Sequence, residues 1–262
     1  MKIITCVKHV PTSAVTPRIA VTKIGIEEEG LSYEVNEPDL YAIEEALYQR
    51  SLQGGSVTSV TVGPARAKEA LHVAYAKGVD QCIHVVDENS RGTHPALNVR
   101  AIASIAKKLD CDLILAGIQA DDDLQGQFGI ALAEALALPV VTAVTEIRAN
   151  SSARMVTVVR ELGAGYKQEL EVDLPCVLTI QFGIRPLRYT PVMAIVRARS
   201  RKIESIDLGA LGISPEELRM ANPVRVVELC YPEDSGRCEL IDGPAPEMAR
   251  NLVHKLVEAG VV

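Results

Sequence analysis

Short runs of apolar and β-branched residues recur through the first half of the 262-residue chain, and stretches with a helical pattern separate them. Strands that alternate with helices are typical of βαβ units, in which the strands pair in parallel and helices cover both faces of the sheet. The alternation therefore predicts an α/β fold with a Rossmann-like, doubly wound parallel sheet. The expected strands are Lys2–Val7, Ser56–Val62, Gln81–Val86 and Asp112–Ala116, and the expected helices cover 40–52, 65–77, 95–109 and 126–137.

The rest of the chain departs from this alternation. Pro17–Val35 alternates loosely around two glutamates and a glycine, and it is expected to form a β-hairpin. Farther on, three strand-like stretches lead to the apolar run Pro175–Gln181, which is a further strand. An added antiparallel portion is therefore expected beside the parallel sheet, formed by Thr142–Ile147, Arg154–Arg160 and Lys167–Val172.

Residues 185–244 show few regular patterns, apart from a short helix start at 214–218 and one strand over Val224–Leu229. An amphipathic helix is expected over 245–259. A long, thinly structured segment of this kind is not expected to be stable alone and often packs on a partner. We therefore expect an α/β nucleotide-binding domain over 1–184 and an extended C-terminal arm over 185–262.

Composition limits the classes of function. The formal net charge of -7 argues against a general nucleic-acid binder. No apolar run reaches about 18 residues, so no transmembrane helix is expected, and the N-terminus reads as a strand rather than a signal peptide. The six cysteines form no CxxC pair, which favours buried free thiols and a reducing compartment. We expect a cytoplasmic protein, or a protein of the mitochondrial matrix if the source is a eukaryote.

No catalytic constellation stands out in the sequence. The five histidines are scattered, and neither HExxH nor GxSxG occurs. A P-loop motif is absent, and Lys8-His9-Val10-Pro11 follows the first strand where a dinucleotide fingerprint would place GxGxxG. These absences disfavour a dehydrogenase or an NTPase, and we predict no catalytic and no metal-binding residues.

Several loops are expected to meet at the carboxyl edge of the parallel sheet, where ligands bind in open α/β folds. Cys6, Val62 and the stretch Gly117–Gly129 fall at the ends of expected strands. Asn36–Asp39 would join them ahead of a helix, for which Asp39 is a plausible N-cap.

A phosphate-bearing ligand would suit these loops. Backbone amides at the start of the helix over 126–137 could take a phosphate, with the Gln127 amide nearby, and adenine could lie near Val62. The carboxylates of Asp121–Asp123 repel an anion, so at least one of them is expected to cap a helix or to hold a ribose. A solvated acidic loop that only caps a helix is an equally weighted alternative.

The basic run Arg197–Lys202 is typical of a solvated face, and it would also suit docking to an acidic partner. Tyr189, Val192 and Met193 precede it in a loop punctuated by proline. Exposed, these residues would be a partner anchor; buried, they would be simple packing.

Six pieces of the sequence together resemble the β subunit of electron transfer flavoproteins, over essentially the whole chain. In family order they are CVKHVP, VNEPDLYAIEEAL, VTVGPARAKEAL, LAGIQADDDLQGQFG, VVRELGAGYKQELEVDLPCVLTI and RYTPVMAIVRARSRKIE. The resemblance implies an αβ heterodimer with its redox FAD mainly on the α subunit. It also implies a sheet of the adenine nucleotide α-hydrolase-like type in the β subunit and a structural AMP. Electrons would pass from an acyl-CoA or other primary dehydrogenase to a quinone oxidoreductase or another acceptor, without catalytic residues on this chain.

The resemblance also assigns residues. The family's partner-docking loop falls on Arg188–Arg199, with Tyr189, Val192, Met193, Arg197 and Arg199 as docking residues. The AMP contacts fall on Cys6, Asn36, Glu37, Pro38, Asp39, Val62, Gly117, Gln119, Ala120, Asp122, Asp123, Gln127, Phe128 and Gly129.

One branch of the family bifurcates electrons and binds a second FAD in place of AMP. That branch carries an Asp-Thr-rich segment before the third helix, and Arg91–Asn98 lacks it, so AMP is predicted here. An electron-bifurcating β subunit stays open as an alternative. A stand-alone adenine-nucleotide-binding regulatory module is another, although such a module would end soon after its sheet.

Overall fold

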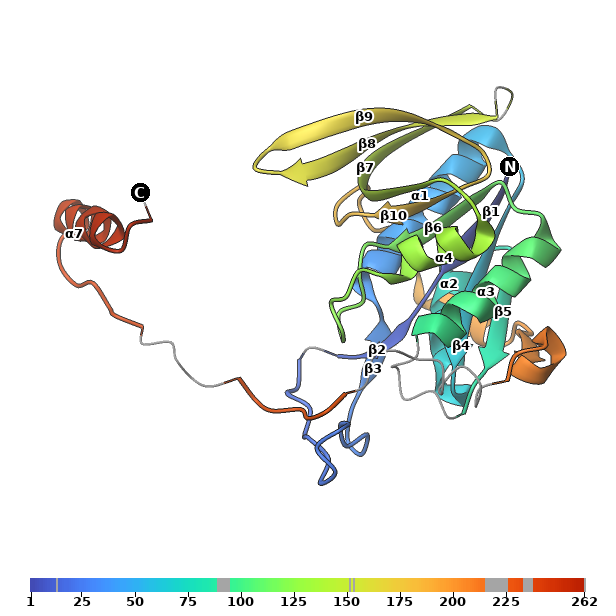
Figure 1. The fold of residues 1–262 in the computed structure, drawn as a ribbon, viewed down its shortest axis with the longest axis horizontal. Coiled ribbons are helices and arrows are strands. Elements are labelled where there is room, and N and C mark those ends of the chain that lie inside the picture. The colour runs from blue at the N-terminus through green and yellow to red at the C-terminus, as the bar shows by residue number, and fades with distance from the viewer. Residues whose placement is uncertain are drawn as a thin grey trace. The chain divides into compact units, whose positions relative to one another are not determined.

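The structure, a computed structural model, describes residues 1–12, 14–88, 95–150, 152, 154–214, 226–232 and 238–261. Two compact units make up the chain, Met1–Val227 and Glu228–Val262, and each is described by itself. The described residues of the larger unit form an α/β fold around one nine-stranded sheet (Figure 1).

Seven strands of this sheet run parallel to their neighbours, in the order β11-β5-β4-β1-β6-β10-β7. β1 lies between β4 and β6, so the chain builds outward on one side of β1 and then crosses to the other. Ligands bind next to such a switch of direction in open α/β sheets. The seven strands are β1 (Lys2–Cys6), β4 (Ser56–Gly63), β5 (Gln81–Val86), β6 (Leu113–Gly117), β7 (Val140–Asn150), β10 (Cys176–Ile180) and β11 (Glu204–Asp207).

Helices cover both faces of the parallel strands, as the doubly wound prediction requires. Successive residues of β1 show this, because Ile3 packs in the core under α1 and α2, whereas Ile4 packs in the core under α3 and α4. Central strands that are buried on both faces read as continuous apolar runs, which explains why the sequence located them. The helices are α1 (Glu37–Gln53), α2 (Lys68–Lys77), α3 (Pro95–Leu109) and α4 (Phe128–Leu136).

An antiparallel extension completes the sheet, as predicted. β7 pairs with β8 (Met155–Gly163), which pairs with β9 (Tyr166–Asp173), both antiparallel. The chain then returns as β10, which inserts between β6 and β7 and pairs in parallel with both.

The predicted hairpin over Pro17–Val35 is wrong. The second sheet instead pairs β2 (His9–Pro11) with β3 (Tyr33–Val35), and only an isolated bridge between Ile19 and Ile26 forms within the excursion. The apolar residues of this excursion find no core, since Val21 is 96% exposed. Without a buried face, local alternation does not fix a strand pairing.

Two elements of the larger unit were not predicted. The expected loop before the basic run contains α5 (Val192–Arg199), and the segment read as irregular contains the edge strand β11. The larger unit also contains two short 3₁₀ helices, η1 (Ala65–Ala67) and η2 (Leu208–Leu211).

The second unit contains α7 (Ala245–Glu258), close to the predicted helix over 245–259. None of its residues is buried. The strand predicted over Val224–Leu229 does not form in its described part, 226–229, and most of the helix start at 214–218 lies outside the described residues.

Candidate functional site

A cleft of about 770 Å³, including the solvent at its mouth, opens at the carboxyl edge of the parallel sheet. The cleft lies where β1, β4 and β6 end and where α1, α3 and α4 begin. It is lined by Cys6, Val7, Lys8, Asn36, Asp39, Val62, Pro95, Asn98, Ile102, Ala116, Gly117, Ile118, Gln119, Ala120, Asp123, Gln125, Gly126, Gln127 and Phe128.

Asp39 joins two strand ends at the base of the cleft. Its carboxylate accepts hydrogen bonds from the backbone N–H of Lys8 at 2.8 Å and of Gly117 at 2.9 Å. Burial raises the pKa of the Asp39 carboxyl to about 7, although these hydrogen bonds act in the opposite direction. The prediction that Asp39 caps the following helix is wrong, because α1 begins two residues earlier, after Asn36.

Gly117 is required at this junction. A Cβ there would lie 2.5 Å from Asp39 Oδ1 and 2.6 Å from Pro38 Cβ. The approach of β6 to the start of α1 therefore leaves no room for a side chain.

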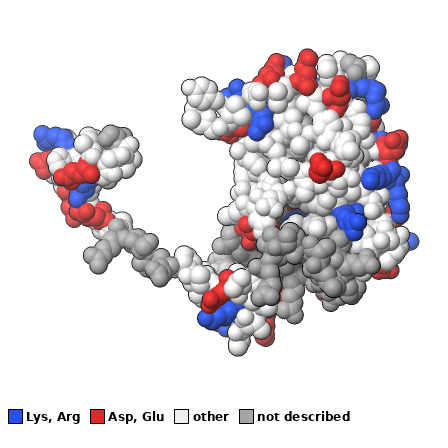
Figure 2. Space-filling view, viewed as in Figure 1, with Lys and Arg blue, Asp and Glu red and all other residues white. Residues whose placement is uncertain are grey.

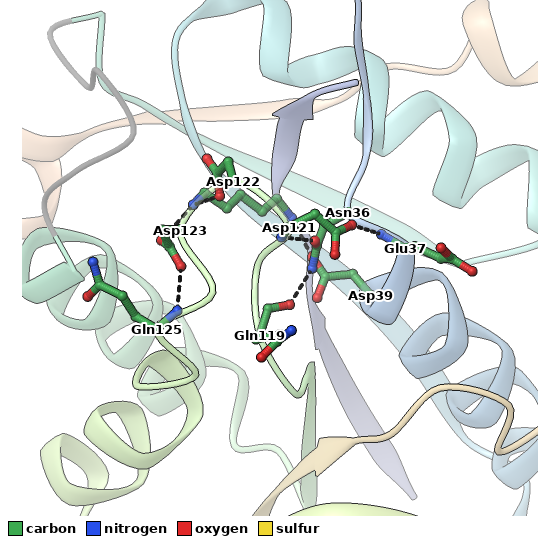
Figure 3. Close-up of polar contacts among 9 residues, drawn as sticks. Asn36, Glu37, Asp39, Gln119, Asp121, Asp122, Asp123 and Gln125 are labelled. Atoms are coloured by element: carbon green, nitrogen blue, oxygen red, sulfur yellow. Dashed lines mark hydrogen bonds and ion pairs between the residues drawn. The ribbon is translucent and has the colours of Figure 1, made fainter. Parts of the chain in front are cut away.

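Asn36 holds the loop after β6, and Figure 3 shows it beside that loop. Its Oδ1 accepts the backbone N–H of Asp121 at 2.9 Å, and its Nδ2 donates to the carbonyl of Gln119 at 2.9 Å. Asn36 is 1% exposed, so these bonds satisfy an amide that is removed from water.

Each of the three aspartates of the loop has a partner (Figure 3). Asp121 Oδ2 accepts the N–H of Glu37 at 3.1 Å, in the first turn of α1, so this aspartate caps a helix as expected of at least one of them. Lys8 Nζ pairs with Asp122 at 2.5 Å and with Asp123 at 3.0 Å. Burial lowers the pKa of Lys8, but the two carboxylates outweigh it and the net shift is upward, so the pairs are ionic.

The N-terminus of α4 opens onto the cleft. Gln127 is its N-cap and makes no side-chain capping bond. The first N–H groups of a helix have no intrahelical acceptor, so those of Phe128 and Gly129 are available to an anion. Gly129 lets the helix start lie against β10, because a Cβ there would be 2.3 Å from Thr179 Cγ2.

Apolar residues form the opposite wall of the cleft. Cys6, Ile102 and Ala116 belong to the core between the sheet and α3, and Val62 and Phe128 pack against that core. Burial raises the pKa of the Cys6 thiol well above its usual value, so Cys6 contributes a small apolar surface rather than a reactive thiolate. A slot of this kind suits a planar base.

The cleft contains most of the nucleotide residues named from the sequence. Glu37, Pro38, Asp122 and Gly129 do not line it, although Asp122 pairs with the lining residue Lys8. The predicted residues that do line the cleft are Cys6, Asn36, Asp39, Val62, Gly117, Gln119, Ala120, Asp123, Gln127 and Phe128. The sequence reading missed the contribution of α3, namely Pro95, Asn98 and Ile102, whose spacing along one helix face was the available signal.

The predicted docking residues lie apart from this cleft, on or before α5. Tyr189 is 83% exposed, Val192 66% and Met193 62%. α5 rests on α2 through Ala198, whose carbonyl contacts His72 Nδ1 at 3.2 Å. Arg197 and Arg199, in the last turn, are also exposed. Val192 and Met193 are thus exposed on a helix, and Tyr189 is exposed in the segment before it.

Two absences apply to the part of the chain that the structure describes. No group of three or more His, Cys, Asp or Glu side chains there could hold a metal ion. No helix there combines the length and the apolar character needed to cross a membrane.

The chain is similar to known proteins over most of its length. A family model described as electron transfer flavoprotein domain matches residues 23–211. Proteins named electron transfer flavoprotein subunit beta are 30% identical in Methylophilus methylotrophus and 32% identical in Clostridium acetobutylicum, each over 98% of both chains. A protein of Acetobacterium woodii named Caffeyl-CoA reductase-Etf complex subunit CarD is 32% identical over 100% of both chains.

Proposed function

Because the chain belongs to the β-subunit family of electron transfer flavoproteins, we propose that it supports an FAD held mainly by an α subunit and binds a structural AMP in its cleft. In this proposal the chain carries no catalytic residues of its own. The heterodimer takes electrons from an acyl-CoA or other primary dehydrogenase and delivers them to a quinone oxidoreductase or another acceptor.

The observation that carries the AMP proposal is the division of the cleft into two ends. Uncapped N–H groups of α4 offer partial positive charge for a phosphate, and the apolar wall around Val62 offers a surface for a base. The carboxylates of the loop do not oppose a phosphate freely, since Asp122 and Asp123 pair with Lys8. A ribose would lie between the two ends, beside Asn36 and Gln119.

We propose that residues from 185 onward form the arm that packs on the α subunit, and that α5 docks the electron-donating partner. Figure 2 shows a broad uncharged area on one face of the larger unit, with most charged side chains toward its rim. A partner subunit that covers such an area buries few charged side chains, which supports a stable heterodimer.

Burial of free thiols supports an intracellular, reducing location. Cys6, Cys82 and Cys176 are free and buried. We propose the cytoplasm, or the mitochondrial matrix in a eukaryote.

The alternative is a β subunit that holds a second FAD, and one observation favours it: the similarity to the subunit of the Caffeyl-CoA reductase-Etf complex. Half of the segment from which AMP was predicted, residues 91–94 of 91–98, lies outside the described residues.

The two candidates differ in the contents of the purified heterodimer. Flavin is measured by absorbance after release from the denatured complex, and AMP by chromatography of the same supernatant. One flavin and one AMP per heterodimer are expected. Two flavins without AMP would overturn the AMP proposal in favour of the second FAD, and failure to recover any stable partner would contradict the heterodimer itself.

A further inference from the structure

Asn98 lines the cleft and carries a buried polar atom that has no hydrogen-bond partner among the described residues. It belongs to the first turns of α3 and lines the cleft with Pro95 and Ile102 of the same helix. Its side-chain oxygen Oδ1 is buried, and no donor among the described residues reaches it. A buried acceptor without a partner is costly, and such atoms commonly await a ligand or an ordered water.

The position of Asn98 tells which part of a ligand it would meet. Ile102 follows Asn98 by four residues, so the two side chains lie on one face of α3, one turn apart. Ile102 belongs to the apolar core against which Val62 packs. The oxygen of Asn98 therefore belongs to the apolar wall, whereas the backbone groups suited to a phosphate come from the start of α4.

We propose that Asn98 reads the base of the bound nucleotide, by accepting a hydrogen bond from the exocyclic amino group of adenine at Oδ1. The inference rests on the proposed nucleotide site. The chemistry is selective because an adenine joined to ribose has a single N–H donor group, its amino group, and its ring nitrogens only accept. A purine that lacks the amino group leaves the Asn98 oxygen buried and unpaired.

The test compares two nucleotides on the full chain purified with its α subunit and freed of bound nucleotide. Titration calorimetry measures the dissociation constants of AMP and of purine riboside 5′-monophosphate, which has hydrogen in place of the amino group. For the unaltered protein we expect AMP to bind about tenfold more tightly. Asn98→Val should reduce this preference to within about twofold. Asn98→Ala replaces it if Asn98→Val does not fold.

Ile102→Val is the matched control, since it removes one methylene from the same wall and leaves the acceptor in place. Ile102→Val should weaken the binding of both nucleotides to a similar extent and leave the ratio of their dissociation constants unchanged.

The outcomes separate this inference from the proposed function. If the unaltered protein binds AMP but Asn98→Val keeps the same preference, Asn98 does not read the base and the inference is wrong. If Asn98→Val instead removes a preference for AMP over 2′-deoxy-AMP, the oxygen meets the ribose, which also refutes it. If the unaltered protein binds no AMP, the proposed function fails and this inference fails with it.

Discussion

The carboxylate of Asp39 connects three segments that are distant in sequence. It lies in the first turn of α1, and it accepts hydrogen bonds from the amides of Lys8, after β1, and of Gly117, at the end of β6. Both cleft edges therefore depend on a single buried group whose pKa is raised by its burial.

The raised pKa makes stability depend on pH. An unfolded Asp releases its proton near pH 4, whereas folded Asp39 holds it until about pH 7, so the folded state binds more protons between these values. The stabilisation from this group is complete below the unfolded pKa and is lost as the pH rises through the folded one. Between about pH 5 and pH 7, we expect the unfolding free energy to fall by roughly 2–3 kcal/mol more than in Asp39→Asn.

Denaturant unfolding at several pH values measures this difference. Asp110→Asn, at a carboxyl whose side chain is 96% exposed, should leave the slope unchanged. Parallel curves for Asp39→Asn and the unaltered protein would show that Asp39 is already ionised at low pH.

A methyl group at residue 117 should separate the same segments. Gly117→Ala would force its Cβ against Asp39 and Pro38, and we expect a loss of about 1–3 kcal/mol in unfolding free energy together with less bound AMP. Unfolding and nucleotide extraction measure the two effects. Gly209→Ala meets nothing within 4 Å and serves as the control. A stable Gly117→Ala with full AMP content would mean that the junction relaxes easily.

Sequence patterns located individual site residues better than their partners. The order strand, polar loop, helix placed Asn36 and Gln127 at the carboxyl edge, because that order alone decides which loops meet there. The pairing of Lys8 with Asp122 joins residues 114 positions apart, and no local pattern reports it. The role of Asp39 was mistaken for the same reason: a capping residue and a long-range acceptor have the same local signature.

At the scale of elements, a buried ionic cluster ties α1 to α2 and to the segment before α5. Glu44 accepts from Lys77 Nζ at 2.8 Å and from Arg188 Nε at 2.5 Å, and the side chains of Glu44 and Lys77 are 3% and 6% exposed. Beside it, Glu45 pairs with Arg185. α5 is thereby held through charges as well as packing.

Removing one charge of this cluster should cost more than removing the pair. Glu44→Gln leaves the Lys77 ammonium buried without a counter-charge, and we expect a loss of about 3 kcal/mol in unfolding free energy. Glu44→Leu combined with Lys77→Met should lose less, because it removes the buried Lys77 ammonium together with its counter-charge. Glu169→Gln, in the exposed pair with Arg148, should change stability by less than about 1 kcal/mol. A double variant as unstable as the single one would contradict this account.

The exposed apolar residues of α5 lead us to a prediction about the rate of electron transfer. Val192→Asp should slow transfer from the cognate dehydrogenase roughly tenfold or more, because a charge replaces an anchor at the docking surface, while flavin content stays unchanged. Stopped-flow reduction of the flavin measures the rate. Val21→Asp, at a residue that is 96% exposed elsewhere in the unit, should leave the rate unchanged. Loss of flavin in Val192→Asp would show that α5 is structural instead.

Helices and strands that bury many side chains were predictable from the sequence, and those that bury few were not. The central strands are buried over most of their length and rich in apolar and β-branched residues, so the sequence located them. α5 buries only Ala198, and β11 is an edge strand with a mostly exposed pattern. Neither has the apolar period by which a helix or strand is recognised.

At the scale of the whole molecule, α7 presents an apolar stripe that its own unit does not cover. Leu252, Val253 and Val257 are 49%, 57% and 58% exposed, and they recur at helical spacing. We expect Val253→Asp to weaken association with the α subunit roughly tenfold or more without changing the unfolding of the larger unit. Sedimentation or a titration of the two subunits measures the association. Asn251→Asp, on the same helix outside the stripe, is the control; equal effects of the two substitutions would rule out the stripe as a contact surface.

The insertion of β10 between β6 and β7 has a consequence for synthesis. The chain emerges from the ribosome N-terminus first, and by residue 173 it has all the strands of the larger unit except β10 and β11. β6 and β7 then each lack a neighbour, because the strand that bridges them comes only at Cys176–Ile180. Unpaired strand edges expose backbone groups and apolar surface to other chains. The nascent protein therefore passes through a stage, just before β10 appears, in which it most needs a chaperone and in which slower translation would prolong the risk of aggregation.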